Sequence, residues 1–318
     1  MTISWPDEID AVLVNDLTCG LSYLTPAGGA VVCAVAPIGM RDRELGTVGF
    51  TTSLGFGRKL ERIERDPKVA LAFHAREHGI GDTSNQRYVL VQGDARFDAR
   101  PNPQMMERLG AQAAAYTGPP RRGPFWDRWL SAYYADRVLV TIEVTRIISW
   151  PSLDAAGTPE VFGAPLPDER ARPQKAPTNG TAPRVDVAKA ATKAATLPHR
   201  LLAYRQSDGY PAVVPVQVAA SGPDGVRLTG ASGLPEGGRR AGLLAHSFRA
   251  QAIGLECSQY TGWLEVDGGG AVYAPHTASG FKIPPNKTIM LLANGLLARR
   301  GLAKARKEGR AGVSGESR

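Results

Sequence analysis

Three hydroxyl side chains and two cations lie within nine residues of this 318-residue sequence. Thr51, Thr52 and Ser53 end a run with the pattern of a strand, and Arg58 and Lys59 follow two glycines where a helix is predicted to begin. The first N–H groups of a helix are free and its dipole is positive there, so this position favours an anion. The pattern predicts a phosphate site, but an ordinary exposed turn with two solvated cations would show the same residues.

The elements that must position this turn follow from the spacing of apolar residues. The pattern predicts a strand over 47–52, a helix over 59–65 and two further strands over 69–74 and 87–97. Asp66-Pro67 ends the helix, because the residue before a proline is pushed out of the helical region and proline cannot continue the hydrogen-bond ladder.

The order of these pieces resembles a known family. Phe-Thr-Thr, the Arg-Lys turn, Asp-Pro, Val-Ala-Leu-Ala-Phe and Arg-Tyr-Val-Leu-Val-Gln-Gly follow one another between residues 50 and 93. This order is similar to that of the pyridoxamine 5′-phosphate oxidase-like split β-barrels, the flavin and deazaflavin oxidoreductase superfamily. The resemblance implies a mainly β (α+β) fold, a split β-barrel like that of the FMN-binding proteins.

The resemblance also implies a cofactor and the residues that bind it. The cofactor would be flavin mononucleotide (FMN) or, as the alternative, the deazaflavin coenzyme F-420. Its phosphate would be bound by Arg58 and Lys59, helped by a set of hydroxyls: Thr51, Thr52 and Ser53. Tyr88 stands where the oxidase has a glutamine that contacts the flavin ring. The turn is two residues longer than in the oxidase, and no cationic strand precedes it, so pyridoxamine phosphate is not the expected substrate.

The second half of the sequence repeats the first in outline, which predicts a duplication. We expect a first barrel over 1–150, a Pro/Ala-rich linker over 151–197, a second, degenerate barrel over 198–297 and a basic tail over 298–318. The family places its cofactor between the two barrels of a homodimer. This chain is therefore expected either to form a homodimer or to supply both barrels itself, as an intrachain pseudo-dimer.

Several finer expectations concern this second half. Arg239 and Arg240 are predicted to open a helix-like or turn segment, and 212–219 is predicted to be one strand. The proline-rich part of the linker should be extended or mobile, whereas its alanine-rich end, 185–196, could form a short helix. The basic tail is predicted to be a solvated helix that frays.

The expected function is hydride transfer to or from a small organic substrate. Because the cofactor carries such chemistry, the sequence assigns no catalytic side chain. One alternative is a non-catalytic protein that carries flavin, deazaflavin or haem. Another is a nucleic-acid-associated protein that uses its basic tail, but no aromatic residues are interleaved with the tail's cations, so nucleic acid is not the expected partner.

Composition agrees with a globular protein. The hydrophobic content is 43%, the charged content 21% and the net charge +8, with much of the excess in the linker and the last twenty residues. Cys19, Cys33 and Cys257 are far apart in sequence, which favours free thiols in a reducing compartment. No signal peptide or membrane span is predicted, so we expect a cytoplasmic protein.

The histidines and tryptophans are the remaining candidates for ligand-binding or core residues. His74 and His78 have a spacing that could serve zinc, but His74 ends a strand with no third ligand nearby in sequence, so no metal site is expected. His246 and His276 are expected to be polar residues of the second barrel, with haem ligation left open by the family resemblance. Three of the tryptophans are expected to pack in the core or at an interface: Trp126, Trp129 and Trp263.

Overall fold

The first half of the chain forms one antiparallel sheet. The computed structural model describes residues 3–98, 103–230 and 233–309, with 103–106 described by their backbone alone. The strands of the first sheet pair in the order β2-β1-β5-β6-β7-β4-β3, and β8 adds to β7. Their bounds are β1 Cys19–Leu24, β2 Ala30–Val35, β3 Arg41–Asp42, β4 Thr47–Ser53, β5 Lys68–Phe73, β6 Tyr88–Asp98, β7 Arg137–Trp150 and β8 Glu160–Gly163.

The second half forms another antiparallel sheet with the same topology. Its order is β10-β9-β13-β14-β15-β12-β11, which is the order of the first sheet when β9 to β15 are matched in sequence with β1 to β7. The bounds are β9 His199–Arg205, β10 Pro211–Pro215, β11 Gln217–Gly222, β12 Gly225–Thr229, β13 Arg239–Ser247, β14 Glu256–Asp267 and β15 Gly270–Lys282. The expected mainly β fold of two split barrels is confirmed by these two sheets.

A β-bulge marks the same point in both sheets. The register between β6 and β7 shifts at Gly93, and the register between β14 and β15 shifts at Gly262. A Cβ atom at either glycine would lie 2.1 Å from a carbonyl oxygen of the neighbouring strand. Only glycine fits such a close backbone approach, so each bulge is fixed by its sequence.

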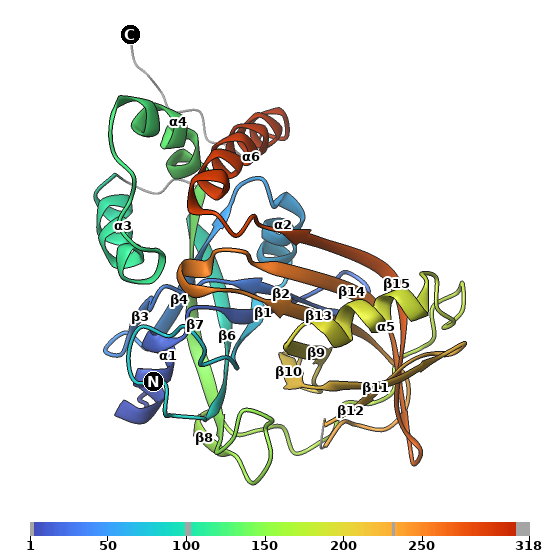
Figure 1. Ribbon diagram of the computed structural model, residues 1–318. Coiled ribbons are helices and arrows are strands. Elements are labelled where there is room, and N and C mark those ends of the chain that lie inside the picture. Colours follow the sequence, from blue (N-terminus) through green and yellow to red (C-terminus); the bar gives the residue numbers. More distant parts are fainter. Residues whose placement is uncertain (1–2, 99–102, 231–232, 310–318) are drawn as a thin grey trace.

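The helices differ between the two halves. Two begin their halves in the same way: α1 (Asp7–Asn15) precedes β1 and α5 (Val187–Thr196) precedes β9. The others are α2 (Gly57–Arg65), α3 (Pro103–Thr117), α4 (Pro124–Ala135) and α6 (Lys287–Lys307), with a short 3-10 turn η1 at Ala250–Ala252. Figure 1 shows α3, α4 and α6 gathered at one end of the first sheet, and α5 lying on the second sheet. No helix in the described residues is long and apolar enough to cross a membrane.

The three largest apolar clusters of the described residues lie in the two sheets and between them. One fills the first sheet around residues such as Phe50 and Ile142, and another fills the second sheet around Leu202 and Tyr273. The third joins the two halves, since it contains Ala72, Tyr88 and Leu90 together with Leu201, Leu244 and Cys257. This seam buries apolar surface of both halves, so the two sheets form one structural unit.

Two elements of the structure lie within the expected linker. β8 lies inside the expected linker and pairs with β7, and α5 is the expected short helix at the linker's end. The expected strand over 212–219 is two strands, because β10 pairs with β9 whereas β11 pairs with β12.

The expected tail does not begin where the second barrel ends. Residue 297 lies inside α6, which packs on α4, and α6 buries Ala298, Leu302 and Ala305. Leu302 and Ala305 belong to the core of the first sheet, so this part of the tail is structural. Its cation Arg299 packs on the ring of Trp129, 4.0 Å from the ring centre. Residues 310–318 lie outside the described residues.

Candidate functional site

Lys59 and Thr52 meet at the start of α2. We call residues 51–59 the α2 turn, because they connect β4 to α2. Lys59 Nζ donates to Thr52 Oγ1 (3.2 Å), lies 4.8 Å from the centre of the Phe56 ring, and also contacts the thiol of Cys33 on β2. All three groups are neutral, and among the described residues Lys59 has no ion-pair partner. A partly buried ammonium with neutral partners favours an anion.

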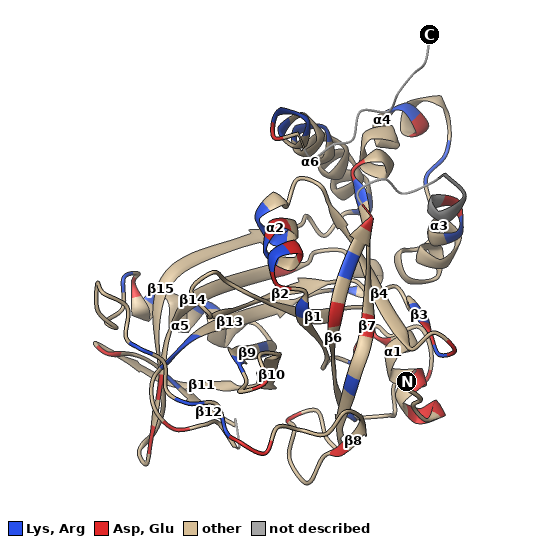
Figure 2. Ribbon diagram, turned by 180° about the vertical axis from the view of Figure 1, so that it is seen from behind, with Lys and Arg blue, Asp and Glu red and all other residues tan. Residues whose placement is uncertain are grey.

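The start of α2 is open in a second respect. No side chain caps its first turn and no acidic residue lies in it, so the helix itself has no negative charge at the positive end of its dipole. Arg58 is exposed on this first turn. Figure 2 shows that α2 carries both signs of charge along its length.

Ser53 belongs to the structure of the turn itself. Its Oγ accepts from the Gly55 N–H (2.9 Å) and bonds the carboxyl of Asp136. Burial raises the pKa of Asp136, and the hydrogen bond from Ser53 opposes that shift. Gly55 in turn packs against Gly301 of α6: a Cβ atom on Gly55 would lie 3.0 Å from the Gly301 Cα. The turn is therefore fixed by the Ser53 hydroxyl, by Asp136 at the end of α4 and by the contact with α6.

The other two expected binding residues lie apart from Lys59. Side chains alternate along a strand, so Thr51 lies on the opposite face of β4 from Thr52. Tyr88 pairs with Trp150 at one end of β7, whereas Thr52 pairs with Val138 at the other end. Tyr88 is buried at the seam and donates to the Val213 carbonyl (2.6 Å) of the second half. The structure thus brings together Thr52 and Lys59, with Arg58 beside them, and separates Thr51 and Tyr88 from that group.

The second half has a paired-cation segment at the equivalent connection. We call residues 233–240 the β13 turn, because they lead from β12 into β13 as the α2 turn leads from β4 toward β5. Arg239 and Arg240 begin a strand here, which corrects the expected helix-like segment. They pair with Leu264 and Trp263 of β14, and such long-range pairing decides the local structure.

The cations of the β13 turn are occupied by the chain itself. Arg239 is 1% exposed and donates to four backbone carbonyls, those of Ala171 (3.2 Å), Pro235 (2.8 Å), Glu236 (2.5 Å) and Gly237 (3.3 Å). Arg240 donates through its backbone N–H to Gln174 Oε1 (3.0 Å) and through its guanidinium to the Lys175 carbonyl (3.1 Å). The linker segment 171–175, expected to be extended or mobile, is thus fixed across the β13 turn.

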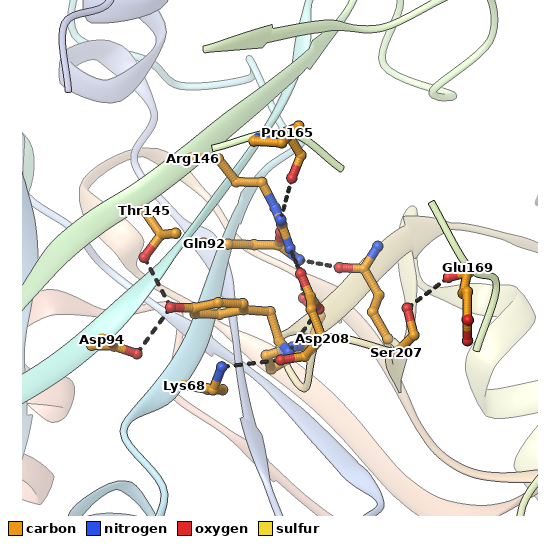
Figure 3. Close-up of polar contacts among 12 residues, drawn as sticks. Lys68, Gln92, Asp94, Thr145, Arg146, Pro165, Glu169, Ser207 and Asp208 are labelled. Carbon is orange, nitrogen blue, oxygen red and sulfur yellow. Dashed lines mark hydrogen bonds and ion pairs between the residues drawn. The ribbon is translucent and has the colours of Figure 1, made fainter. Parts of the chain in front are cut away.

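A polar network joins the two halves on another side of the seam (Figure 3). Arg146 of β7 is 3% exposed; it donates to Gln92, to the Pro165 carbonyl (2.8 Å) and to the carboxylate of Asp208. Gln92 in turn donates to Gln206 (2.7 Å) and to the Pro211 carbonyl (2.6 Å) of the second half. Every polar group drawn from the first half has a partner in the linker or the second half, so the network positions the halves.

Tyr210 completes that network from the turn between β9 and β10. Its hydroxyl donates to Asp94 (3.1 Å) and lies 2.9 Å from the Thr145 hydroxyl. Its ring has Lys68 Nζ at 4.2 Å and the Arg146 guanidinium at 5.3 Å from its centre. These groups satisfy one another, and we assign them a structural role.

Three histidines distant in sequence meet at the seam. His74 Nε2 lies 2.7 Å from His246 Nε2, and the ring of His199 lies 5.3 Å from that of His74 and 5.1 Å from that of His246, centre to centre. We call these three residues the histidine cluster. Burial lowers the pKa of His74 to about 3 and lowers the pKa of His246 well below its ordinary value, so both rings are neutral. His78 and His276 lie outside the cluster.

A cavity of about 650 Å³ opens beside the histidine cluster and is lined by residues of both halves, among them His74, Arg76, Glu77, Asp154, His199 and Arg200. Arg76 is paired with the buried carboxylate of Asp16 (2.5 Å), and Glu77 bonds His199. His199, at the start of β9, is not among the residues predicted from the sequence. The repeated order of elements in the two halves could have matched His74 with His246, but it gives no signal for His199.

Known proteins resemble this chain only distantly. No family model and no curated protein matches the chain. A solved structure of a conserved hypothetical protein from Mycobacterium tuberculosis is 24% identical, with a TM-score of 0.35, over 47% of this chain and 86% of that one. A pyridoxamine 5′-phosphate oxidase-related, FMN-binding protein from Nostoc punctiforme is 11% identical, with a TM-score of 0.31, over 67% of this chain and 97% of that one.

A third solved structure spans both halves. It is a haem-binding protein from Mycobacterium smegmatis, 13% identical with a TM-score of 0.31, over 94% of this chain and 99% of that one.

Proposed function

We propose that the α2 turn binds the phosphate of a flavin-type coenzyme, FMN or coenzyme F-420, and that the chain uses this coenzyme to transfer hydride to or from a small organic substrate. One observation carries the proposal: Lys59 is partly buried beside an uncapped helix start, and the groups that it contacts among the described residues are neutral. An anion brought to this place gains a charge-assisted hydrogen bond without displacing an existing ion pair.

The residues present fit the phosphate end of such a coenzyme. Lys59 and Arg58 would supply positive charge to the phosphate. The Thr52 hydroxyl, 3.2 Å from Lys59 Nζ, would orient the Lys59 ammonium. When bound, the coenzyme would supply a tricyclic ring that accepts or delivers hydride. The chain's own part is to hold the anion and to fix the turn through Ser53 and Asp136.

A binding titration tests the proposal. The full chain is titrated with FMN and, separately, with coenzyme F-420, and the fluorescence of each coenzyme is followed. Lys59→Met removes the charge and keeps most of the aliphatic stem, so it should weaken binding by about 1.5–3 kcal/mol, roughly tenfold to a hundredfold. Lys189→Met, on the exposed side of α5, is the matched control and should leave the affinity unchanged. Equal affinity in both variants would overturn the assignment of the α2 turn.

A second assay separates an enzyme from a carrier. The coenzyme-loaded chain is reduced with a hydride donor, and its reoxidation by candidate acceptors is followed by absorbance. Turnover faster than that of the free coenzyme supports the oxidoreductase. A tightly bound coenzyme whose reoxidation is no faster than that of the free coenzyme would support the carrier instead.

A further inference from the structure

His74 and His246 are equivalent residues of the two sheets. Val69 of β5 pairs with the bulge residue Gly93, and Ala241 of β13 pairs with the bulge residue Gly262. His74 lies five residues after Val69, and His246 lies five residues after Ala241. Because equivalent strands face each other across the seam, the two rings meet there, with Nε2 atoms 2.7 Å apart.

The hydrogen bonds of the histidine cluster fix which nitrogens carry protons. His74 Nδ1 lies 2.9 Å from the Ala72 carbonyl, which can only accept, so Nδ1 carries the proton and Nε2 has a lone pair. His246 Nε2 must then donate to it, which leaves His246 Nδ1 with a lone pair that is buried and has no partner among the described residues. His246 Nδ1 can therefore take up the proton of Nε2, which would free the Nε2 lone pair for an ion.

The third ring is held in the manner of a metal ligand. His199 bonds the Glu77 carboxylate through Nε2, so Nε2–H donates and Nδ1 keeps a lone pair. Ligating histidines commonly donate their other N–H to a backbone carbonyl or a carboxylate, which orients the ring. His74 has the first kind of partner and His199 the second.

The separation of the rings is also that of a metal site. Their centres lie 4.9, 5.3 and 5.1 Å apart. Three imidazoles around one tetrahedral ion, at metal–nitrogen distances near 2 Å, would have ring centres about 5 Å apart. As they stand, the described residues contain no group of three or more ligands set to hold an ion. The two Nε2 atoms share a proton at 2.7 Å, whereas two ligands of one ion lie about 3.3 Å apart.

An ion has access to the cluster and a suitable charge environment. The 650 Å³ cavity is lined by His74 and His199 and carries the carboxylates of Glu77 and Asp154. Of its two guanidinium groups, Arg76 is neutralised by Asp16, and Arg200 is bonded to backbone carbonyls and to Gln217.

We propose that the histidine cluster binds one divalent transition metal ion of the zinc class. The ion takes the place of the proton between His74 and His246, that proton moves to His246 Nδ1, and His199 is recruited as the third ligand. Imidazole nitrogen is a preferred ligand of such ions. The rings need to separate by only about half an ångström to accept the ion. This site is independent of the α2 turn and of the coenzyme proposed for it.

Metal titration of the tag-free full chain tests the site. The chain is stripped with a chelator and titrated with Co²⁺, whose visible absorbance reports tetrahedral imidazole coordination, and thermal unfolding is followed with and without Zn²⁺. We expect one Co²⁺ per chain and a rise in melting temperature with Zn²⁺, because the ion binds only the folded state. His246→Gln and His199→Gln should each weaken Co²⁺ binding by about 100-fold or more.

Two features keep this test decisive. His276→Gln, in the second sheet but outside the cluster, is the matched control and should bind Co²⁺ as the unmodified chain does. His199 is partly exposed, so its variant should fold even where a change at the buried His246 prevents folding. The proposal is overturned if the unmodified chain shows no tetrahedral Co²⁺ band, or if both cluster variants retain its affinity.

Discussion

The α2 turn and the β13 turn occupy the same connection in two sheets of the same strand order, yet their cations have opposite surroundings. In the first half, Arg58 is exposed, and Lys59 donates to the Thr52 hydroxyl and has no ion-pair partner among the described residues. In the second half, Arg239 is bonded to four carbonyls and Arg240 to the linker. Paired cations in a sequence therefore do not by themselves identify a ligand site, because what matters is whether the chain supplies their partners.

The two turns are also supported by different segments. The α2 turn rests on α6, through the contact of Gly55 with Gly301, whereas the β13 turn is covered by residues 171–175 of the linker. Each supporting segment can be removed or weakened separately, which allows the comparison to be tested.

The largest effect is expected from shortening α6. Deleting residues 298–318 removes the buried side chains of Leu302 and Ala305 from the first core and the contact at Gly55. We expect a loss of about 3–5 kcal/mol in the free energy of unfolding, measured by urea denaturation. Deleting only 310–318 is the control and should leave stability unchanged. Equal stability of the two truncated chains would show that α6 does not support the α2 turn.

The next largest effect is expected at Arg239. Arg239→Met leaves four carbonyls of the β13 turn and the linker without their donor, so we expect about 3 kcal/mol of destabilisation. Arg58→Met, at the equivalent connection, should change stability by no more than about 0.5 kcal/mol, because the side chain is exposed. Urea denaturation of both variants gives the comparison directly. Similar values for the two would show that the cations of the two turns do not differ in role.

A smaller effect is expected at Gln174. This side chain donates to the Gly28 carbonyl (3.0 Å) and accepts from the Arg240 N–H (3.0 Å), so it fastens the linker to both halves. Gln174→Ala should cost about 1–2 kcal/mol and make the linker easier to cleave near residues 171–175 in limited proteolysis. Gln86→Ala, in an exposed loop, is the control. Unchanged cleavage of the linker in the Gln174 variant would argue that other contacts hold it.

Much of the fold could be predicted from the sequence because its signals are local. The strand before Thr52, the helix ended by Asp66-Pro67 and the strand at Val69 follow from periodicity and from proline, and the structure confirms them. The start of β13 could not be predicted in this way. Arg239 and Arg240 are extended because they pair with β14, a contact made between residues far apart in sequence.

The candidate sites also differ in whether their residues are close together or far apart in sequence. Thr52 and Lys59 are seven residues apart, so a turn and a helix are enough to bring them together. His74 and His246 are 172 residues apart and meet only because two sheets of equal topology pack face to face. Tyr88 shows the reverse: the family resemblance placed it at the ring of the cofactor, and the strand register places it at the seam, at the opposite end of β7 from Thr52.

The most direct test of the central claim is a coenzyme titration of three forms of the full chain: unmodified, Arg58→Met with Lys59→Met, and Arg240→Met. We predict that the double variant loses about a hundredfold or more in affinity for FMN or coenzyme F-420, whereas Arg240→Met binds as the unmodified chain does. Unchanged affinity in the double variant, or a loss confined to Arg240→Met, would contradict the claim that the α2 turn is the anion site of this molecule.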